Sequence, residues 1–224
     1  MLGDARLWSH QIAQLGVHAH VSVGDLSGGL TMCDLAQFIL QKAPKQFALA
    51  GLSMGGITAL EIMRQAPERI TKLALLDTTA RPMRPEQKAI WHRRMAMASD
   101  GQFAEMLEVD LMPSWLHPER QSDDAFITDI RQMAQRVGPE VFVRQAHAIL
   151  DRPDSRPTLS QIACPTLILV GRHDVICPVE VHEEMSASIP SAKLILVEEC
   201  GHLSPMEQPE AVTAALSEWL QADA

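Results

Sequence analysis

The chain has 224 residues, and 46% of them are hydrophobic, which suits one α/β domain with a buried core and argues against a disordered chain. The formal net charge of −9 repels phosphate backbones and anionic lipid, so we expect neither a nucleic-acid partner nor a membrane partner. Residues 1–20 lack a basic segment followed by an apolar run, and no apolar run reaches the roughly 18 residues of a membrane span, so the sequence predicts a cytoplasmic protein.

The first part of the chain alternates between two kinds of hydrophobic pattern. Helical periodicity covers residues 4–15, 31–43 and 57–66, and short apolar runs predict strands at 17–23, 47–50 and 73–76. In the second helix we expect Leu35, Phe38 and Ile39 to face the core. In the first strand, His18 and His20 share one face, but no third metal ligand lies within sequence reach. This alternation predicts a mostly parallel sheet with helices on both faces.

The pattern changes after Arg81-Pro82. Only helical periodicity follows, at residues 86–98, 102–111, 123–136 and 139–150, and a proline-punctuated stretch from Arg152 to Pro157 closes the segment. Strand and helix patterns then resume at 165–170, 178–188, 193–197 and 207–220. We therefore divide the chain into a first core part at 1–81, an all-helical insertion at 82–157 and a second core part at 158–224.

The run Gly51-Leu52-Ser53-Met54-Gly55-Gly56 stands between a predicted strand and a predicted helix. This is the context in which G-x-S-x-G indicates a nucleophile held on a tight turn, although a glycine-rich loop is the alternative. Such a turn is strained, so small residues are expected at Gly51 and Gly55, and Gly56 allows the helix to pack close to the sheet. The turn exposes the Ser53 hydroxyl and points the Met54 N–H at a developing oxyanion.

A nucleophilic serine needs a base, and the base needs a partner that fixes its tautomer. Asp174 and His202 each follow a predicted strand, and the carboxyl ends of parallel strands meet at one edge of a sheet. An alternative role for Asp174 is to cap the helix at 178–188, but it lies some residues too early. The chain order Ser53, Asp174, His202 is that of one class of serine triad.

The chain resembles the α/β-hydrolase superfamily. Three motifs carry the resemblance: Gly-Leu-Ser-Met-Gly-Gly at 51–56, Gly-Arg-His-Asp at 171–174 and Cys-Gly-His-Leu at 200–203. The resemblance implies a doubly wound α/β-hydrolase fold in which the insertion forms a cap. It also offers Asp77 as a rival acid, since some similar hydrolases place the acid after that strand. It implies an apolar pocket, for which we expect Trp91, Met95 and Trp115 as lining residues.

The function that the resemblance implies is a serine hydrolase of the carboxylesterase type. The substrate would be a small carboxylic ester, lactone or thioester, cleaved through an acyl-enzyme, with no metal or organic cofactor. Alternatives are a C–C bond hydrolase or a cofactor-free perhydrolase that uses the same three residues, and a non-catalytic member of the fold that only binds a ligand. Neither the preferred acyl group nor the oligomeric state follows from the sequence.

The start of the sequence differs from the family pattern. The family has strands ahead of the first helix, and one ends in a loop that donates the second oxyanion N–H. Here Met1-Leu2-Gly3 stands where that loop is expected, so Met1 or Leu2 would join Met54 as oxyanion donors. We hypothesise that the sequence starts at an internal methionine of a longer natural chain. Direct pairing of the strands at 17–23 and 47–50 would contradict this hypothesis.

Overall fold

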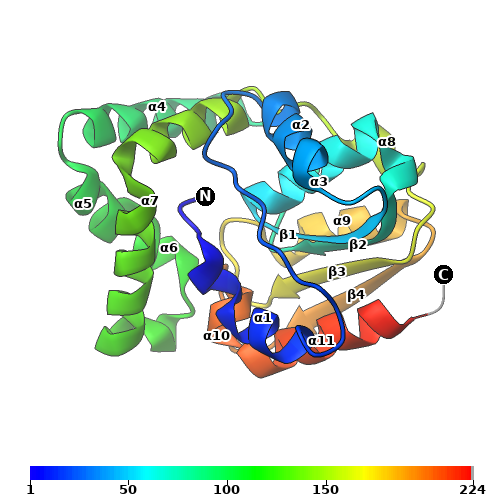
Figure 1. Ribbon diagram of the computed structural model, residues 1–224. Helices are drawn as coiled ribbons and strands as arrows, with labels where there is room; N and C mark the ends of the chain where they lie inside the picture. The colour runs from blue at the N-terminus through cyan, green and yellow to red at the C-terminus, as the bar shows by residue number, and fades with distance from the viewer. Residues whose placement is uncertain (223–224) are drawn as a thin grey trace.

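A computed structural model describes residues 1–222 (Figure 1). Its sheet has four parallel strands among these residues, in the spatial order β1-β2-β3-β4. The strands are β1 (Phe47–Leu52), β2 (Ile70–Leu76), β3 (Thr166–Gly171) and β4 (Ala192–Val197). All four end at the same edge of the sheet, which is the edge that faces the green helices of the insertion in Figure 1.

Helices cover both faces of the sheet, as the alternating pattern predicted. The core helices are η1 (Ala5–Trp8), α1 (Ser9–Leu15), α2 (Met32–Lys42), α3 (Met54–Gln65), η2 (Pro67–Arg69), α9 (Val179–Ser188), α10 (Ser204–Glu207) and α11 (Pro209–Gln221). Helices α3 and α9 pack on one face, α11 packs on the other, and α1 lies against α11.

Strand β2 shows how the two faces are divided. Its side chains alternate, so that Leu73 and Leu75 enter the core beneath α3 and α9, while Ala74 and Leu76 enter the core on the α11 side. All four are fully buried. A strand that is buried on both faces has a continuous apolar sequence, which is what residues 73–76 show.

Every element between β2 and β3 in the described part of the chain is a helix or a helical turn. They are α4 (Pro85–Ser99), α5 (Phe103–Met106), the π-helical turn η3 (Leu107–Leu111), α6 (Met112–Trp115), η4 (Pro118–Ser122), α7 (Asp124–Leu150) and α8 (Arg156–Leu159). Helix α7 bends at Gly138, where φ is 80° and ψ is 169°, and Pro139 follows. The bend falls between the two helices that the sequence predicted at 123–136 and 139–150, because a proline disfavours helical geometry at the residue before it.

The strand predicted at 17–23 is wrong, because those residues form no strand and are largely exposed. They therefore do not pair with β1, whose outer edge has no neighbouring strand among residues 1–222. The hypothesis that the sequence starts at an internal methionine of a longer chain stays a prediction. Phe38 of α2 was expected in the core, but 40% of its surface is exposed. The alternation of Val and His at 17–23 fits a strand, but a strand also needs a partner edge to pair with.

None of the helices in the described part of the chain combines the length and the apolar character that crossing a membrane requires.

Candidate active site

Ser53 lies on the predicted strained turn between β1 and α3. Its backbone has φ 53° and ψ −117°, which a non-glycine residue rarely adopts. A Cβ atom on Gly51 would stand 2.3 Å from the Gly55 carbonyl oxygen, and one on Gly56 would stand 2.6 Å from the Thr78 side chain. Gly55 differs from our expectation, since a Cβ there would meet no atom of the described residues within 4 Å. The close packing of the turn therefore depends on Gly51 and Gly56.

Two hydrogen bonds to β2 and the residues after it hold the turn in place. The Ser53 N–H donates to the Leu76 carbonyl oxygen at 2.9 Å, and the Thr78 hydroxyl donates to the Ser53 carbonyl oxygen at 2.7 Å. The Thr78 N–H in turn donates to Nε2 of His182 on α9 at 2.9 Å. Burial lowers the pKa of His182 to about 4, so its ring is neutral at pH 7 and Nε2 is free to accept.

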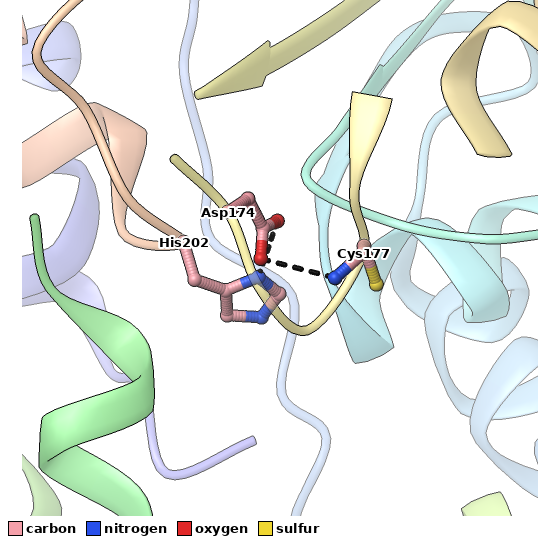
Figure 2. A group of neighbouring side chains, drawn as sticks. All are labelled: Asp174, Cys177 and His202. Atoms are coloured by element: carbon pink, nitrogen blue, oxygen red, sulfur yellow. Dashed lines mark hydrogen bonds and ion pairs between the residues drawn. The ribbon is translucent and has the colours of Figure 1, made fainter. Parts of the chain in front are cut away.

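The structure brings Ser53, His202 and Asp174 together, although they are far apart in the sequence. His202 Nε2 lies 2.8 Å from Ser53 Oγ, and His202 Nδ1 lies 2.7 Å from Asp174 Oδ2. The other carboxylate oxygen, Asp174 Oδ1, accepts the N–H groups of Ile176 at 2.8 Å and Cys177 at 3.0 Å. Figure 2 shows the bonds that Asp174 makes to His202 and Cys177.

The charge of Asp174 is stabilised where it lies. Burial alone would raise the pKa of this carboxyl, but His202 and the two backbone N–H groups together hold it below its usual value. Asp174 and His202 are both buried. A carboxylate in this position keeps the imidazole in the tautomer whose Nε2 accepts a proton.

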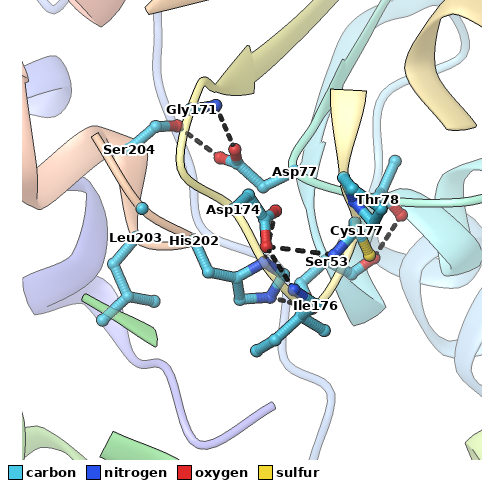
Figure 3. Close-up of polar contacts among 12 residues, drawn as sticks. Ser53, Asp77, Thr78, Gly171, Asp174, Ile176, Cys177, His202, Leu203 and Ser204 are labelled. Atoms are coloured by element: carbon cyan, nitrogen blue, oxygen red, sulfur yellow. Dashed lines mark hydrogen bonds and ion pairs between the residues drawn. The ribbon is translucent and has the colours of Figure 1, made fainter. Parts of the chain in front are cut away.

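Figure 3 shows that Asp77, the rival acid, is bonded to Gly171 and Ser204 and not to His202. Its Oδ1 accepts the Gly171 N–H at 2.9 Å and its Oδ2 accepts the Ser204 hydroxyl at 2.5 Å. Complete burial, and then the nearby charge of Asp174, raise the pKa of Asp77 well above its usual value. The geometry thus assigns the partner of His202 to Asp174, while Asp77 joins the end of β3 to the start of α10.

Glu207 is a buried polar residue to which we assigned no role from the sequence. Its Oε1 accepts the N–H groups of Gly201 and Leu203, each at 3.1 Å, and its Oε2 accepts the N–H of His117 in the insertion at 2.7 Å. Burial raises the pKa of Glu207, and the three N–H donors oppose that rise. One side chain thereby binds both residues that flank His202 and a residue of the insertion. An acidic residue five positions after His202 was the available signal.

A second contact joins the insertion to the same loop. The His202 N–H donates to the carbonyl oxygen of Trp115 in α6 at 2.8 Å. The position of His202 therefore depends on how the insertion packs.

Asp174, Cys177 and His202 also present three potential metal-ligand atoms within 4.8 Å of one another (Figure 2). Asp174 and His202 are already bonded to each other. Burial, and then the charges of Asp174 and Asp77, raise the pKa of the Cys177 thiol well above its usual value, so the thiolate that a metal needs is disfavoured. The arrangement suits proton transfer better than metal binding.

A cavity of about 1290 Å³ lies between the insertion and the carboxyl end of the sheet, and Ser53, Met54 and His202 line it. Two of the three predicted pocket residues, Trp91 and Trp115, line it as well. Met95 does not; it is buried against Ala146 and Leu150 between α4 and α7. Residues of the edge strand β1 line the cavity as well.

The three predicted oxyanion donors, Met54, Met1 and Leu2, differ in whether their N–H groups are free to bind a substrate oxygen. Met54 is the first residue of α3, where the helix leaves N–H groups without helical partners. Met1 lines the cavity. The Leu2 N–H, however, donates to Oε1 of Gln145 in α7 at 3.0 Å, so it is already engaged.

Comparison with known proteins shows the family of the chain. The profile described as "Alpha/beta hydrolase family" matches residues 5–215. The chain belongs to the alpha/beta hydrolase family. The predicted superfamily and fold class are thus confirmed.

The chain is similar to proteins that are named esterases, and its fold is also that of an enol-lactonase. A solved thermophilic esterase from Thermogutta terrifontis, with malate bound, is 32% identical, has a TM-score of 0.85 and covers 97% of this chain and 85% of its own. The enol-lactonase from Burkholderia xenovorans LB400 has a TM-score of 0.87 over 99% of this chain and 88% of its own, but at 24% identity it shows the fold alone. A pimeloyl-[acyl-carrier protein] methyl ester esterase from Nitrosomonas europaea is 29% identical over 79% of this chain and 72% of its own.

Proposed function

We propose that this α/β-hydrolase is a serine esterase that cleaves a small carboxylic ester, lactone or thioester through an acyl-enzyme. One observation carries the proposal: the continuous series of hydrogen bonds from Asp174 through His202 to Ser53, at the wall of a large cavity. The coarser prediction, a hydrolase that acts on ester bonds, is confirmed by relatives that are named esterases.

In the proposed mechanism, Ser53 Oγ attacks the ester carbonyl carbon while His202 Nε2 takes the hydroxyl proton. The Asp174 carboxylate stabilises the imidazolium that forms. The Met54 N–H, at the positive end of α3, binds the oxygen on which negative charge develops. His202 then protonates the leaving alcohol, and the same residues activate a water molecule that hydrolyses the acyl-enzyme.

The test is labelling with a fluorophosphonate, measured as the mass of the intact protein. We expect one adduct on the wild type and none on Ser53→Ala, and hydrolysis of short p-nitrophenyl esters that Ser53→Ala abolishes. A folded wild-type protein that forms no adduct and hydrolyses no ester would contradict the proposal and favour a ligand-binding role.

A further inference from the structure

Four arginines line the cavity, and three of them are already paired with carboxylates. The pairs are Arg81 with Glu184 at 2.6 Å, Arg84 with Glu86 at 3.3 Å and Arg94 with Asp110 at 3.7 Å. Arg152 is the fourth, and no carboxylate oxygen of residues 1–222 lies within 4.0 Å of its guanidinium. Buried or half-buried charges in proteins are ordinarily paired, so this one is conspicuous.

Two of the three guanidinium nitrogens of Arg152 have a contact within residues 1–222. Its Nε donates to the Arg81 carbonyl oxygen at 2.9 Å, and its Nη1 lies 3.7 Å from the Met83 sulfur, a weak contact. For Nη2 no acceptor is recorded in the described part of the chain. Burial lowers the pKa of Arg152, which reflects the cost of holding an unpaired cation there. The guanidinium thus retains donors for a second, planar acceptor.

The charge lies on the wall of the cavity that carries the proposed catalytic residues. Burial, Asp174 and Asp77 raise the pKa of the Cys177 thiol, and Arg152 is close enough to act against them. Cys177 itself lines the cavity and donates its N–H to Asp174. Arg152 and Ser53 therefore line the same cavity, together with apolar side chains such as Met83, Ile176 and Val181. The Met1 amino group also lines it and acts on Cys177, but burial lowers the pKa of that amino group to about 6, so Arg152 is the lasting positive charge there at pH 8.

We propose that Arg152 binds a free carboxylate of the substrate, so that the preferred ester is a monoester of a dicarboxylic acid. The ester carbonyl would lie at Ser53 and the free carboxylate at Arg152. A planar guanidinium binds a carboxylate through two parallel hydrogen bonds, and these bonds are strong where water is largely excluded. One guanidinium among apolar neighbours suits a singly charged carboxylate better than a phosphate dianion. This inference rests on the proposed esterase function.

The experiment compares kcat/KM for matched pairs of methyl esters. The charged set is the monomethyl esters of the straight-chain acids from succinic to adipic, and the neutral set is the methyl esters of monocarboxylic acids of equal length. The variants are Arg152→Gln and Arg152→Lys. The control is Arg144→Gln. Arg144 is also half-buried, also donates its Nε to a backbone carbonyl and has no carboxylate partner among residues 1–222, yet it does not line the cavity.

We expect the wild type to prefer the charged ester at its best chain length, and Arg152→Gln to lower kcat/KM for that ester about 10- to 100-fold, mainly through KM. The neutral ester should lose far less, Arg152→Lys should keep part of the preference, and Arg144→Gln should keep all of it. A wild type that prefers neutral esters at every length would overturn the inference. So would an equal loss on both esters in Arg152→Gln, which a purely structural role at the junction with Arg81 predicts.

A separate binding measurement distinguishes failure of this inference from failure of the esterase proposal. If no ester of either kind is hydrolysed, the esterase proposal fails. Calorimetric titration with glutarate then decides the role of Arg152. Binding that Arg152→Gln abolishes and Arg144→Gln retains supports the carboxylate site, and a wild type that does not bind glutarate overturns it.

Discussion

Replacing Asp174 with asparagine should separate the two candidate acids, because the structure dictates how the amide would sit. The N–H groups of Ile176 and Cys177 hold one oxygen of Asp174, so an asparagine would place its oxygen there and turn its NH₂ group toward His202 Nδ1. Nδ1 would then have to accept, and the ring proton would move to Nε2. In that tautomer Nε2 cannot take the proton of Ser53, which lies 2.8 Å away.

The expected loss of kcat for Asp174→Asn is about 10⁴-fold, or roughly 5.5 kcal/mol of transition-state stabilisation. Asp77→Asn is the matched control on the neighbouring strand. The bonds of Asp77 go to the Gly171 N–H and the Ser204 hydroxyl and not to His202, so an amide there leaves the tautomer of His202 unchanged. Burial, and then Asp174, raise the pKa of the Asp77 carboxyl well above its usual value, which lowers the cost of an uncharged amide in its place. We expect less than about a tenfold change in kcat.

The assay is the initial rate of p-nitrophenyl ester hydrolysis at pH 8, with thermal unfolding to show that both variants fold. An Asp174→Asn variant within tenfold of the wild type would refute the reasoning. So would an Asp77→Asn variant that is folded but as impaired as Asp174→Asn, since Asp77 would then be the acid that orients His202.

Four further substitutions test the surroundings of the site. Gly51→Ala should abolish folding or activity, because the new Cβ would stand 2.3 Å from the Gly55 carbonyl oxygen. Gly55→Ala should be tolerated, since a Cβ there meets no described atom within 4 Å. Equal soluble yield and activity of the two variants would contradict this. Glu207→Gln should turn an NH₂ group toward the His117 N–H and lower the free energy of unfolding by about 2–3 kcal/mol, as measured in urea, and a loss below about 0.5 kcal/mol would disprove that role. His182 has a folded pKa of about 4 against an ordinary 6.5, so the unfolded chain takes up the proton first as the pH falls. Its contribution to stability is therefore complete above pH 6.5 and decreases down to pH 4, by about 2 kcal/mol at pH 5, and urea titrations of His182→Gln should lack that decrease.

The parts of the site that are local in sequence were predictable without a structure. A glycine-flanked serine between an apolar run and a helical pattern is one short segment, and its strained backbone follows from sterics that act within a few residues. Asp174 and His202 were found because each follows a strand, and parallel strands end at the same edge of a sheet. The continuous apolar sequences of β2 and β3 likewise predicted strands buried on both faces.

The remaining features depend on which segments meet in space, and periodicity carries no information about that. Residues 17–23 have the alternation of a strand but form none, because a strand is stable only beside another edge. Met95 has the helical spacing of a pocket residue, yet the packing of α4 against α7 buries it elsewhere. Glu207 binds backbone groups on both sides of His202 and one in the insertion, and only the folded chain brings these donors to one carboxylate. Arg152 likewise could not be singled out from the sequence, because only the fold shows that no carboxylate of residues 1–222 lies beside its guanidinium.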